Sequence, residues 1–259
     1  MKPRRVDYDA ISHLYDSQPH RTKAVDAELL ALMRQRTGGA RLSILDIACG
    51  TGNQLVANRS VVPFDRLVGL DRSQGMLWQA RAKAPSITWI GADAAALPFP
   101  DGSFDFISCQ FAFHHIEDKT RMLQEGFRVL RAEGCLALRN LCPQECHDWL
   151  YYDYFPEAQA RDFEDFWPPD AVIAVMHDCG FAAVSAEREH RYFEEDLLSW
   201  LETVQRRDTC SQLLAISDAA YEAGLRRLTH ELAGRSSPVL RANHLCLVTI
   251  RGGKPKTES

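Results

Sequence analysis

A short apolar run that leads directly into two glycines constrains this chain more than any other feature. Residues 42–48, LSILDIA, have the length and composition of a buried strand, and Gly50 and Gly52 follow in the stretch CGTG. Glycine allows positive φ and a close approach of the backbone to a ligand. A strand, a Gly-x-Gly turn and a helix N-terminus together make a pocket lined by amide N–H groups. The sequence therefore predicts a ligand-binding loop at the carboxyl end of a buried strand.

Strands and helices alternate throughout the first half of the chain. Apolar spacing predicts a helix over 23–36 that Gly38 and Gly39 stop, a helix capped by Ser73, and a later helix that Gly134 ends. Strands are expected at 42–48, 66–70, 86–92, 104–110 and 135–140. This alternation predicts a doubly wound α/β fold, a parallel sheet covered on both faces, whose ligands bind beyond the carboxyl ends of the strands.

The pattern becomes less regular after residue 140. An aromatic and acidic stretch at 142–168 is predicted to be a cap inserted after the fifth strand. A helix at 169–179, a strand at 181–191, helices at 194–206 and 211–233, and a last strand at 243–252 follow. We expect a single domain over 1–252, divided into an N-terminal lid and helix (1–40), a ligand-binding core (41–141), a substrate cap (142–168) and the C-terminal part of the sheet (169–252), with a disordered tail at 253–259.

Composition argues against several classes of protein. The net charge of -5 argues against a nucleic-acid partner, which usually needs a basic surface. No apolar run approaches the roughly 20 residues that span a bilayer, and the first residues lack an apolar signal segment, so membrane insertion is not expected. Eight cysteines without a secretory signal predict reduced thiols in the cytoplasm.

The acidic residues around the glycine loop indicate which ligand it holds. A dinucleotide fingerprint needs a third glycine where this chain has Leu55. Asp46, just before the loop, would repel a pyrophosphate and attract an ammonium group. Asp71 ends the second strand, 19 residues after Gly52, where an acid can accept both hydrogen bonds of a ribose diol.

The third strand adds a site for a purine base. Asp93 follows that strand, where its carboxylate can accept a bond from an adenine amino group while the Ala94 N–H donates to a ring nitrogen. A ligand with a ribose, an adenine, a cationic amino-acid end and no phosphate is S-adenosylmethionine.

Five segments resemble the class I S-adenosylmethionine-dependent methyltransferases of the ubiquinone/menaquinone C-methylase type. They are ILDIACGTG, GLDRSQGML, GADAAALPFPDGSFDFISCQFAFHHI, RVLRAEGCLAL and the N-terminal YDAISHLYD. The resemblance implies a Rossmann-like, seven-stranded, mostly parallel sheet with its last strand antiparallel. It also implies in-line transfer of the methyl group of S-adenosylmethionine to an acceptor, leaving S-adenosylhomocysteine.

The resemblance further implies a set of cofactor-binding residues. They are Asp46 and the backbone of Ala48, Gly50 and Gly52 for the methionine part, Asp71 for the ribose, Arg72 and Met76 beside the adenine, Asp93 and Ala94 at its edge, Gln110 and Phe111 under the sulfonium, and Tyr15 and Arg21 closing over the cofactor. Some of these have structural alternatives, because Asp46, Asp71 and Asp93 are also residue types that cap turns and Met76 fits a plain helix core.

His114 and His115 are the candidate catalytic residues. They follow the fourth strand, at the ligand edge of the sheet, where a histidine can take a proton from an acceptor at neutral pH. The alternative is that the pair shapes the loop, since many members of the family carry it whatever their substrate.

Candidate substrate residues lie at and after the fifth strand. Arg139 and Asn140 suit a carboxylate or carbonyl, or else pair with Asp46 or Glu145. A dense aromatic set in the cap, from which Tyr151, Tyr154 and Trp167 are the candidate substrate contacts, either lines an apolar or planar substrate site or forms the cap's own core.

Cys142, Cys146 and His147 suggest metal ligands, but their spacing is not that of a usual zinc site. The thiolates of the two cysteines would also suit a soft ligand such as trivalent arsenic. Ordinary cap residues remain the favoured interpretation, and no metal site is predicted.

The acceptor is expected to be a small molecule. A tRNA or protein methyltransferase and a non-catalytic S-adenosylmethionine-binding protein are the alternatives. The sequence leaves open carbon, oxygen or nitrogen as the methylated atom, and a monomer or a homodimer as the oligomeric state.

Overall fold

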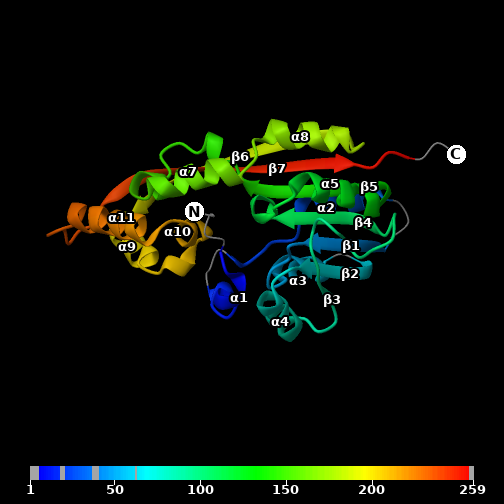
Figure 1. The fold of residues 1–259 in the computed structure, drawn as a ribbon, viewed down its shortest axis with the longest axis horizontal. Helices are drawn as coiled ribbons and strands as arrows, with labels where there is room; N and C mark the ends of the chain where they lie inside the picture. The colour runs from blue at the N-terminus through cyan, green and yellow to red at the C-terminus, as the bar shows by residue number, and fades with distance from the viewer. Residues whose placement is uncertain (1–5, 18–20, 37–40, 62, 257–259) are drawn as a thin grey trace. The chain divides into compact units, whose positions relative to one another are not determined.

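The computed structural model describes residues 6–17, 21–36, 41–61 and 63–256. These residues form two compact units, coloured along the chain in Figure 1. We call them the sheet unit (Tyr8–Asn140, Pro169–Glu187 and Val248–Ser259) and the helical unit (Met1–Asp7, Leu141–Pro168 and Arg188–Leu247).

A seven-stranded sheet has the order β3-β2-β1-β4-β5-β7-β6. Neighbouring strands from β3 to β5 pair in parallel, and β7 runs in the opposite direction (Figure 1). This confirms the predicted Rossmann-like fold with an antiparallel last strand. The strands are β1 (Leu42–Ile47), β2 (Phe64–Asp71), β3 (Thr88–Gly91), β4 (Phe104–Gln110), β5 (Leu130–Leu141), β6 (Ala182–Asp196) and β7 (Leu240–Gly253).

Helices of the sheet unit follow the predicted order with shifted ends. Asp26 caps α2 by accepting N–H bonds from Glu28 and Leu29, so the helix begins four residues later than predicted. Ser73 caps α4 as expected. The elements are α1 (Tyr8–Ile11), η1 (Tyr15–Ser17), α2 (Ala27–Gln35), α3 (Asn53–Arg59), α4 (Gln74–Lys83), η3 (Phe113–His115), α5 (Lys119–Val129) and α8 (Pro169–Asp178).

Gly134 does not end a helix, contrary to the prediction. Helix α5 ends at Val129, and β5 begins at once with Leu130. A Cβ on Gly134 would lie 2.9 Å from the carbonyl oxygens of Arg131 and Asp105. The glycine is therefore needed for the close approach of the backbone at the start of β5.

Both faces of the sheet are covered, as the alternation of strand and helix predicts. Leu42 and Ile44 of β1 share a buried cluster with Ala137 of β5 and with side chains of α2, α3 and α4. Leu136, the neighbour of Ala137, points to the other face, because alternate residues of a strand face opposite sides. There it meets α5 so closely that a Cβ on Gly126 would lie 2.6 Å from it.

The helical unit contains α6 (Leu150–Tyr154), α7 (Pro156–Asp165), α9 (Leu197–Val204), α10 (Ser211–Ala215), α11 (Asp218–Glu231) and the short turns η4 (Pro143–Glu145) and η5 (Arg207–Thr209). The single helix predicted over 211–233 is two helices, because Ile216 is extended and Ser217 caps α11 through the Ala220 N–H. The segment 141–168 shares this unit with 188–247.

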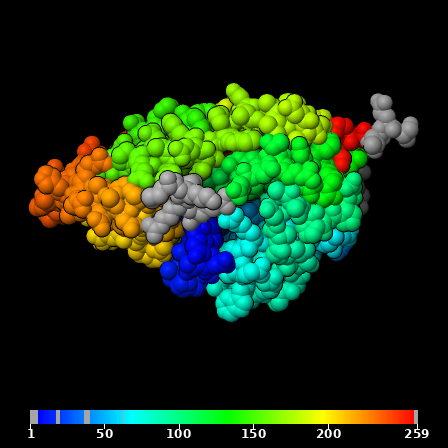
Figure 2. Space-filling model, viewed as in Figure 1, coloured from blue at the N-terminus to red at the C-terminus, as the bar shows by residue number. Residues whose placement is uncertain are grey.

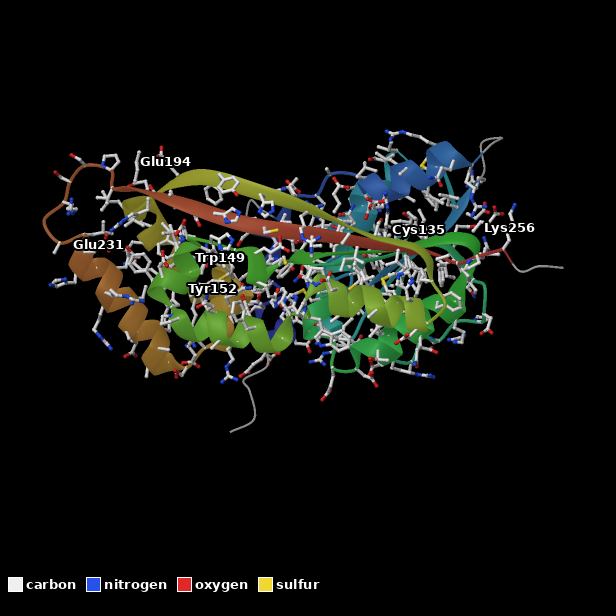
Figure 3. The ribbon with its side chains drawn as sticks, turned by 90° about the horizontal axis from the view of Figure 1, so that it is seen from above. Cys135, Trp149, Tyr152, Glu194, Glu231 and Lys256 are labelled. Carbon is white, nitrogen blue, oxygen red and sulfur yellow. The ribbon has the colours of Figure 1, made fainter. Side chains whose placement is uncertain are left out.

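Aromatic side chains form the core of the helical unit. The rings of Trp149 and Tyr152 lie 4.6 Å apart (Figure 3), and Phe155 is completely buried. A Cβ on Gly224 would lie 2.3 Å from the Phe155 ring, so glycine lets α11 pack directly on it.

Residues 253–256, which the sequence placed in a disordered tail, have defined positions. Gly253 is the last residue of β7, and the Lys254 ammonium donates hydrogen bonds to three carbonyl oxygens near the end of α5. In the described ranges, no helix has both the length and the apolar character needed to cross a membrane.

Candidate functional site

The glycine loop leaves β1 through alternating positive φ angles. Ala48 and Gly50 both have φ of 54°, and Gly52 has φ of 78° and caps α3. A Cβ on Gly52 would lie 2.2 Å from the Trp89 indole, so this side of the loop is closed by packing. No atom lies within 4 Å of a Cβ built on Gly50, so the loop is open there.

Asp71, at the end of β2, is tied to this loop. Its two carboxylate oxygens accept the Gly50 N–H at 2.8 Å and the Ser73 N–H at 2.9 Å. Burial raises the pKa of Asp71, and these backbone hydrogen bonds oppose the rise. The side chain remains half-buried, with lone pairs left for a ligand.

Asp93 lies at the same carboxyl edge of the sheet as Asp71. The parallel register places Asp71 beside Gly91, so Asp93 follows two residues beyond that pair. It is exposed, and one carboxylate oxygen accepts the Ala95 N–H at 2.8 Å in a local turn. Asp71 and Asp93 thus come together at one edge, as the sequence predicted from their positions after strands.

Asp46 is a buried acid near the end of β1. One oxygen accepts the Ser108 hydroxyl at 2.7 Å. Burial raises the pKa of Asp46 to about 7, the carboxylates of Asp26 and Asp71 add to the rise, and Lys23 opposes it. A cation bound beside Asp46 would favour its ionised form.

The N-terminal segment packs against the loop and α4. Asp9 accepts the Ser73 hydroxyl at 2.7 Å and the Gly75 N–H at 2.6 Å, and these bonds lower its pKa. Asp16 accepts the Thr51 hydroxyl and lies 2.6 Å from the Lys83 ammonium. Figure 2 shows the dark-blue N-terminal segment directly beside cyan residues of the sheet unit.

Tyr15 and Arg21 form a pair in this segment. The Arg21 guanidinium lies 3.9 Å from the Tyr15 ring centre and donates to its hydroxyl at 2.8 Å. Burial is the main cause that raises the pKa of Tyr15, and the charge of the Asp71 carboxylate adds to it. The pair therefore lies close enough to Asp71 to be influenced by its charge. Arg21 Nε is buried and has no hydrogen-bond partner within the described part of the chain.

A family model and a curated relative match this sequence. The family described as "Methyltransferase domain" matches residues 44–134. The demethylmenaquinone methyltransferase of Thermus thermophilus is 32% identical over 166 residues, which cover 54% of this chain and 74% of that enzyme. The chain belongs to the class I S-adenosylmethionine-dependent methyltransferases of the quinone C-methylase type.

One further relative agrees with this family, and one solved structure shares the fold. The demethylmenaquinone methyltransferase of Lactococcus lactis subsp. lactis is 34% identical over 150 residues, which cover 56% of each protein, so the match spans little more than half of that enzyme. A putative methyltransferase from an antibiotic biosynthesis pathway of Anabaena variabilis shares the fold, with a TM-score of 0.65 at 21% identity, over 88% of this chain and 98% of that one.

S-adenosylmethionine is the cofactor of this methyltransferase family, and the residues present fit it. The open backbone at Gly50, the remaining lone pairs of Asp71 and the exposed carboxylate of Asp93 are the acceptors and space that its nucleoside needs. The unpartnered Arg21 Nε offers a buried donor at the same edge.

Other predicted cofactor residues take different positions. Arg72 is exposed and Ala94 half-buried, both at the carboxyl edge. Met76 is only 1% exposed and packs in the core, which fits the structural alternative for this residue. Gln110 donates to Asp26 at 2.6 Å, and Phe111 follows it with φ of 54°.

His114 is buried and His115 is half-buried. Burial lowers the pKa of His115 to about 4 and that of His114 well below its ordinary value. His115 shares a 2.6 Å hydrogen bond with the Tyr8 hydroxyl, and His114 bonds to the Asn140 side chain. These rings are neutral at pH 7 and disfavour the protonated form that a general base must take up, so the geometry suits the shaping of the loop.

The candidate substrate residues divide between the two units. In the sheet unit, Arg139 donates to the Thr249 hydroxyl at 3.0 Å. In the helical unit, Tyr154 donates to Glu231 at 2.7 Å, and the rings of Tyr151 and Tyr154 both lie against Trp200. Trp167 is half-buried. The contacts of the two tyrosines are those of a core, the alternative that the sequence left open.

Sequence reasoning missed several residues of this edge. Tyr8, Asp9 and Asp16 hold the N-terminal segment, and Lys23 and Asp26 lie beside Asp46 and Gln110. Only the resemblance of YDAISHLYD to the family's opening segment pointed toward the first three. No local pattern pointed to Lys23, because its partners come from distant strands.

Proposed function

We propose that this chain binds S-adenosylmethionine at the glycine loop and transfers its methyl group to a small-molecule acceptor. The observation that supports this most directly is the arrangement of Asp71, the open Gly50 backbone and Asp93 at one edge of the sheet. In this assignment Asp71 holds the ribose hydroxyls, Asp93 and Ala94 contact the adenine, and Asp46 faces the ammonium end of the methionine part.

When bound, S-adenosylmethionine supplies a methyl group that its positive sulfur already activates. The protein then has to align the acceptor and exclude water. Tyr15 and Arg21 are suited to exclude water over the nucleoside, and Gln110, fixed by Asp26, is suited to orient the groups near the sulfur. His114 and His115 have no proton-transfer role in this proposal, because burial disfavours the protonated form that a base would have to take up.

We also propose that the acceptor carries a phenolic or enolic oxygen. Lys23 Nζ lies 4.4 Å from the Phe111 ring centre. Burial lowers the pKa of Lys23, the charges of Arg21 and Arg139 lower it further, and the carboxylate of Asp46 opposes them, so three cations and one acid influence this point. Such a group favours an anionic oxygen. Both reported relatives are named for methylating a demethylmenaquinone, so reduced naphthoquinones are the first acceptors to test.

Calorimetric titration with S-adenosylmethionine, S-adenosylhomocysteine and NAD tests the cofactor assignment. We expect micromolar binding of the first two and none of NAD. Asp71→Ala should weaken cofactor binding by about 2 to 3 kcal/mol, because charge-assisted hydrogen bonds to a diol are lost. Asp65→Ala, in the exposed start of the same strand, is the control. Binding of NAD alone, or an unchanged affinity in Asp71→Ala, would contradict the assignment.

Release of S-adenosylhomocysteine with a panel of acceptors tests the reaction. Phenolic and reduced quinone acceptors should react faster than neutral analogues without the hydroxyl group. Lys23→Gln should raise KM for them more than tenfold, whereas Lys256→Gln, on an exposed side chain, should not. Cofactor binding without product from any small acceptor would favour the non-catalytic alternative. A cytoplasmic location and the lack of a nucleic-acid partner stay predictions.

A further inference from the structure

Two cysteines that are far apart in the sequence meet in the helical unit beside a glutamate. Cys142 follows β5, Glu145 ends η4, and Cys246 lies in β7. The Cys142 N–H donates to the Cys246 carbonyl at 2.8 Å, which fixes the two segments side by side. The two sulfurs and a carboxylate oxygen of Glu145 all lie within 4.8 Å of one another.

Glu145 is oriented by its neighbours from β6. Its Oε1 accepts a hydrogen bond from Arg188 Nε at 2.6 Å. Its Oε2 lies 3.9 Å from Cys246 Sγ and 3.8 Å from His190 Nε2. One oxygen is thus held by the guanidinium, while the other faces the sulfur and the imidazole. The hydrogen bond from Arg188 lowers the pKa of Glu145, so this carboxylate is ionised at neutral pH.

We propose that Cys142, Glu145 and Cys246 bind one Zn²⁺ ion, with His190 adjacent to the remaining coordination position. Zinc takes sulfur, nitrogen and oxygen ligands in a tetrahedron, and thiolates select it over magnesium or calcium. Bond lengths of about 2.0 to 2.3 Å place tetrahedral ligand atoms roughly 3.3 to 3.8 Å apart. The present spacing therefore needs only a small contraction.

The surroundings suit a metal that enters from solvent. The thiols of Cys142 and Cys246 are buried, while the side chains of Glu145 and His190 are 30% and 39% exposed. His190 Nδ1 lies 3.1 Å from His244 Nε2, a contact that orients the ring, as outer partners of metal-binding histidines do. An ion here would link Cys142, η4 and the part of β7 that lies in the helical unit.

The metal-free thiols are protonated at neutral pH. Burial raises the pKa of Cys142 to about 12 and that of Cys246 to about 11. Metal binding must release these protons, so affinity should rise with pH.

Cys146 is a matched control in the same cluster. Its sulfur donates to the Cys142 carbonyl at 3.3 Å and accepts the Cys246 N–H at 3.3 Å. These bonds direct the sulfur to the backbone and leave it outside the group of three donors.

Cobalt titration of the reduced, full-length protein tests the proposal. We expect one Co²⁺ per chain, a thiolate-to-cobalt charge-transfer absorption in the near ultraviolet, and its loss when Zn²⁺ is added. Cys142→Ser, Cys246→Ser and Glu145→Gln should weaken cobalt binding at least tenfold. Cys146→Ser should keep both the stoichiometry and the absorption. Circular dichroism identifies variants that fail to fold. The charge-transfer absorption of the wild-type protein tests the site even if every variant fails to fold.

Absence of the charge-transfer absorption in the wild-type protein would overturn the proposal. So would an equal loss of cobalt binding in Cys146→Ser. None of these results depends on methyl transfer, so the site and the proposed function can fail separately.

Discussion

Two buried carboxyl groups, Asp46 in the sheet unit and Asp162 in the helical unit, resemble each other at first sight. Burial raises the pKa of each to about 7. Each accepts one hydroxyl hydrogen bond, Asp46 from Ser108 at 2.7 Å and Asp162 from Tyr152 at 2.8 Å. They differ in the charges around them.

Asp46 lies among charged groups that a ligand can join. The carboxylates of Asp26 and Asp71 and the ammonium of Lys23 all influence it, at the edge where the glycine loop opens. Asp162 is held by Tyr152 and by the Gln212 amide, inside a core of aromatic rings. A raised pKa by itself therefore does not mark a functional site, and the surrounding charges and open backbone distinguish the two.

The largest expected effect is on stability in the helical unit. Because the pKa of Asp162 is raised in the folded chain, folding keeps a proton that the unfolded chain releases above about pH 4. The stability from this protonated carboxyl is present below pH 4 and is lost as the pH rises through 7. In the wild-type protein, this group should lower the free energy of unfolding by on the order of 3 kcal/mol between pH 5 and pH 8. Asp162→Asn should abolish that difference, and urea unfolding at the two pH values measures it.

Glu164→Gln, on an exposed side chain of the same helix, is the control for Asp162→Asn and should change little. Asp162→Asn should also leave the affinity for S-adenosylmethionine within twofold. A large loss of cofactor binding would break the distinction between the two carboxyl groups.

An intermediate effect is expected on cofactor binding through Asp46. A bound ammonium favours the ionised carboxylate, so binding should release a proton near pH 7. The affinity for S-adenosylmethionine should rise about tenfold from pH 6 to pH 8 in the wild-type protein and stay flat in Asp46→Asn. Calorimetry in two buffers of different ionisation enthalpy measures the proton release. A pH slope that persists in Asp46→Asn would assign it to another group.

The smallest effects come from the two hydroxyl donors. Ser108→Ala and Tyr152→Phe each remove one hydrogen bond to a buried carboxyl, worth about 1 kcal/mol. Ser108→Ala should move the midpoint of the cofactor-binding pH profile upward by about 0.7 unit. Tyr152→Phe should lower the free energy of unfolding and leave that profile unchanged. If both variants moved the profile alike, the two sites would not be distinct.

Local pattern sufficed for the strands of the sheet and for the acids that follow them. β4 has the predicted ends, and β1 differs by a single residue, because short apolar runs between turn signals form buried strands. Two predicted helix boundaries were wrong. Gly134 lies in a strand that approaches its neighbour closely, and Ile216 interrupts the helix expected over 211–233. Periodicity does not encode either contact.

The chemistry of single side chains was less predictable than their positions. His114 and His115 come at the predicted edge, yet burial makes them poor bases. The tyrosines at 151 and 154 come where a substrate site was expected, yet they pack on Trp200. Cys142 and Cys246 lie 104 positions apart in the sequence, and no local spacing reveals their contact.

The sequence by itself determined the family, the succession of strands and helices along the chain, and the edge of the sheet at which Asp46, Asp71 and Asp93 lie. It could do so because strand direction and the end of each strand are local properties. Tertiary structure alone decided which of these groups are buried, which are held by hydrogen bonds, and which distant sulfurs meet. The pKa of a side chain and the reach of a ligand depend on neighbours from other elements, and only the folded chain brings those neighbours within a few ångströms.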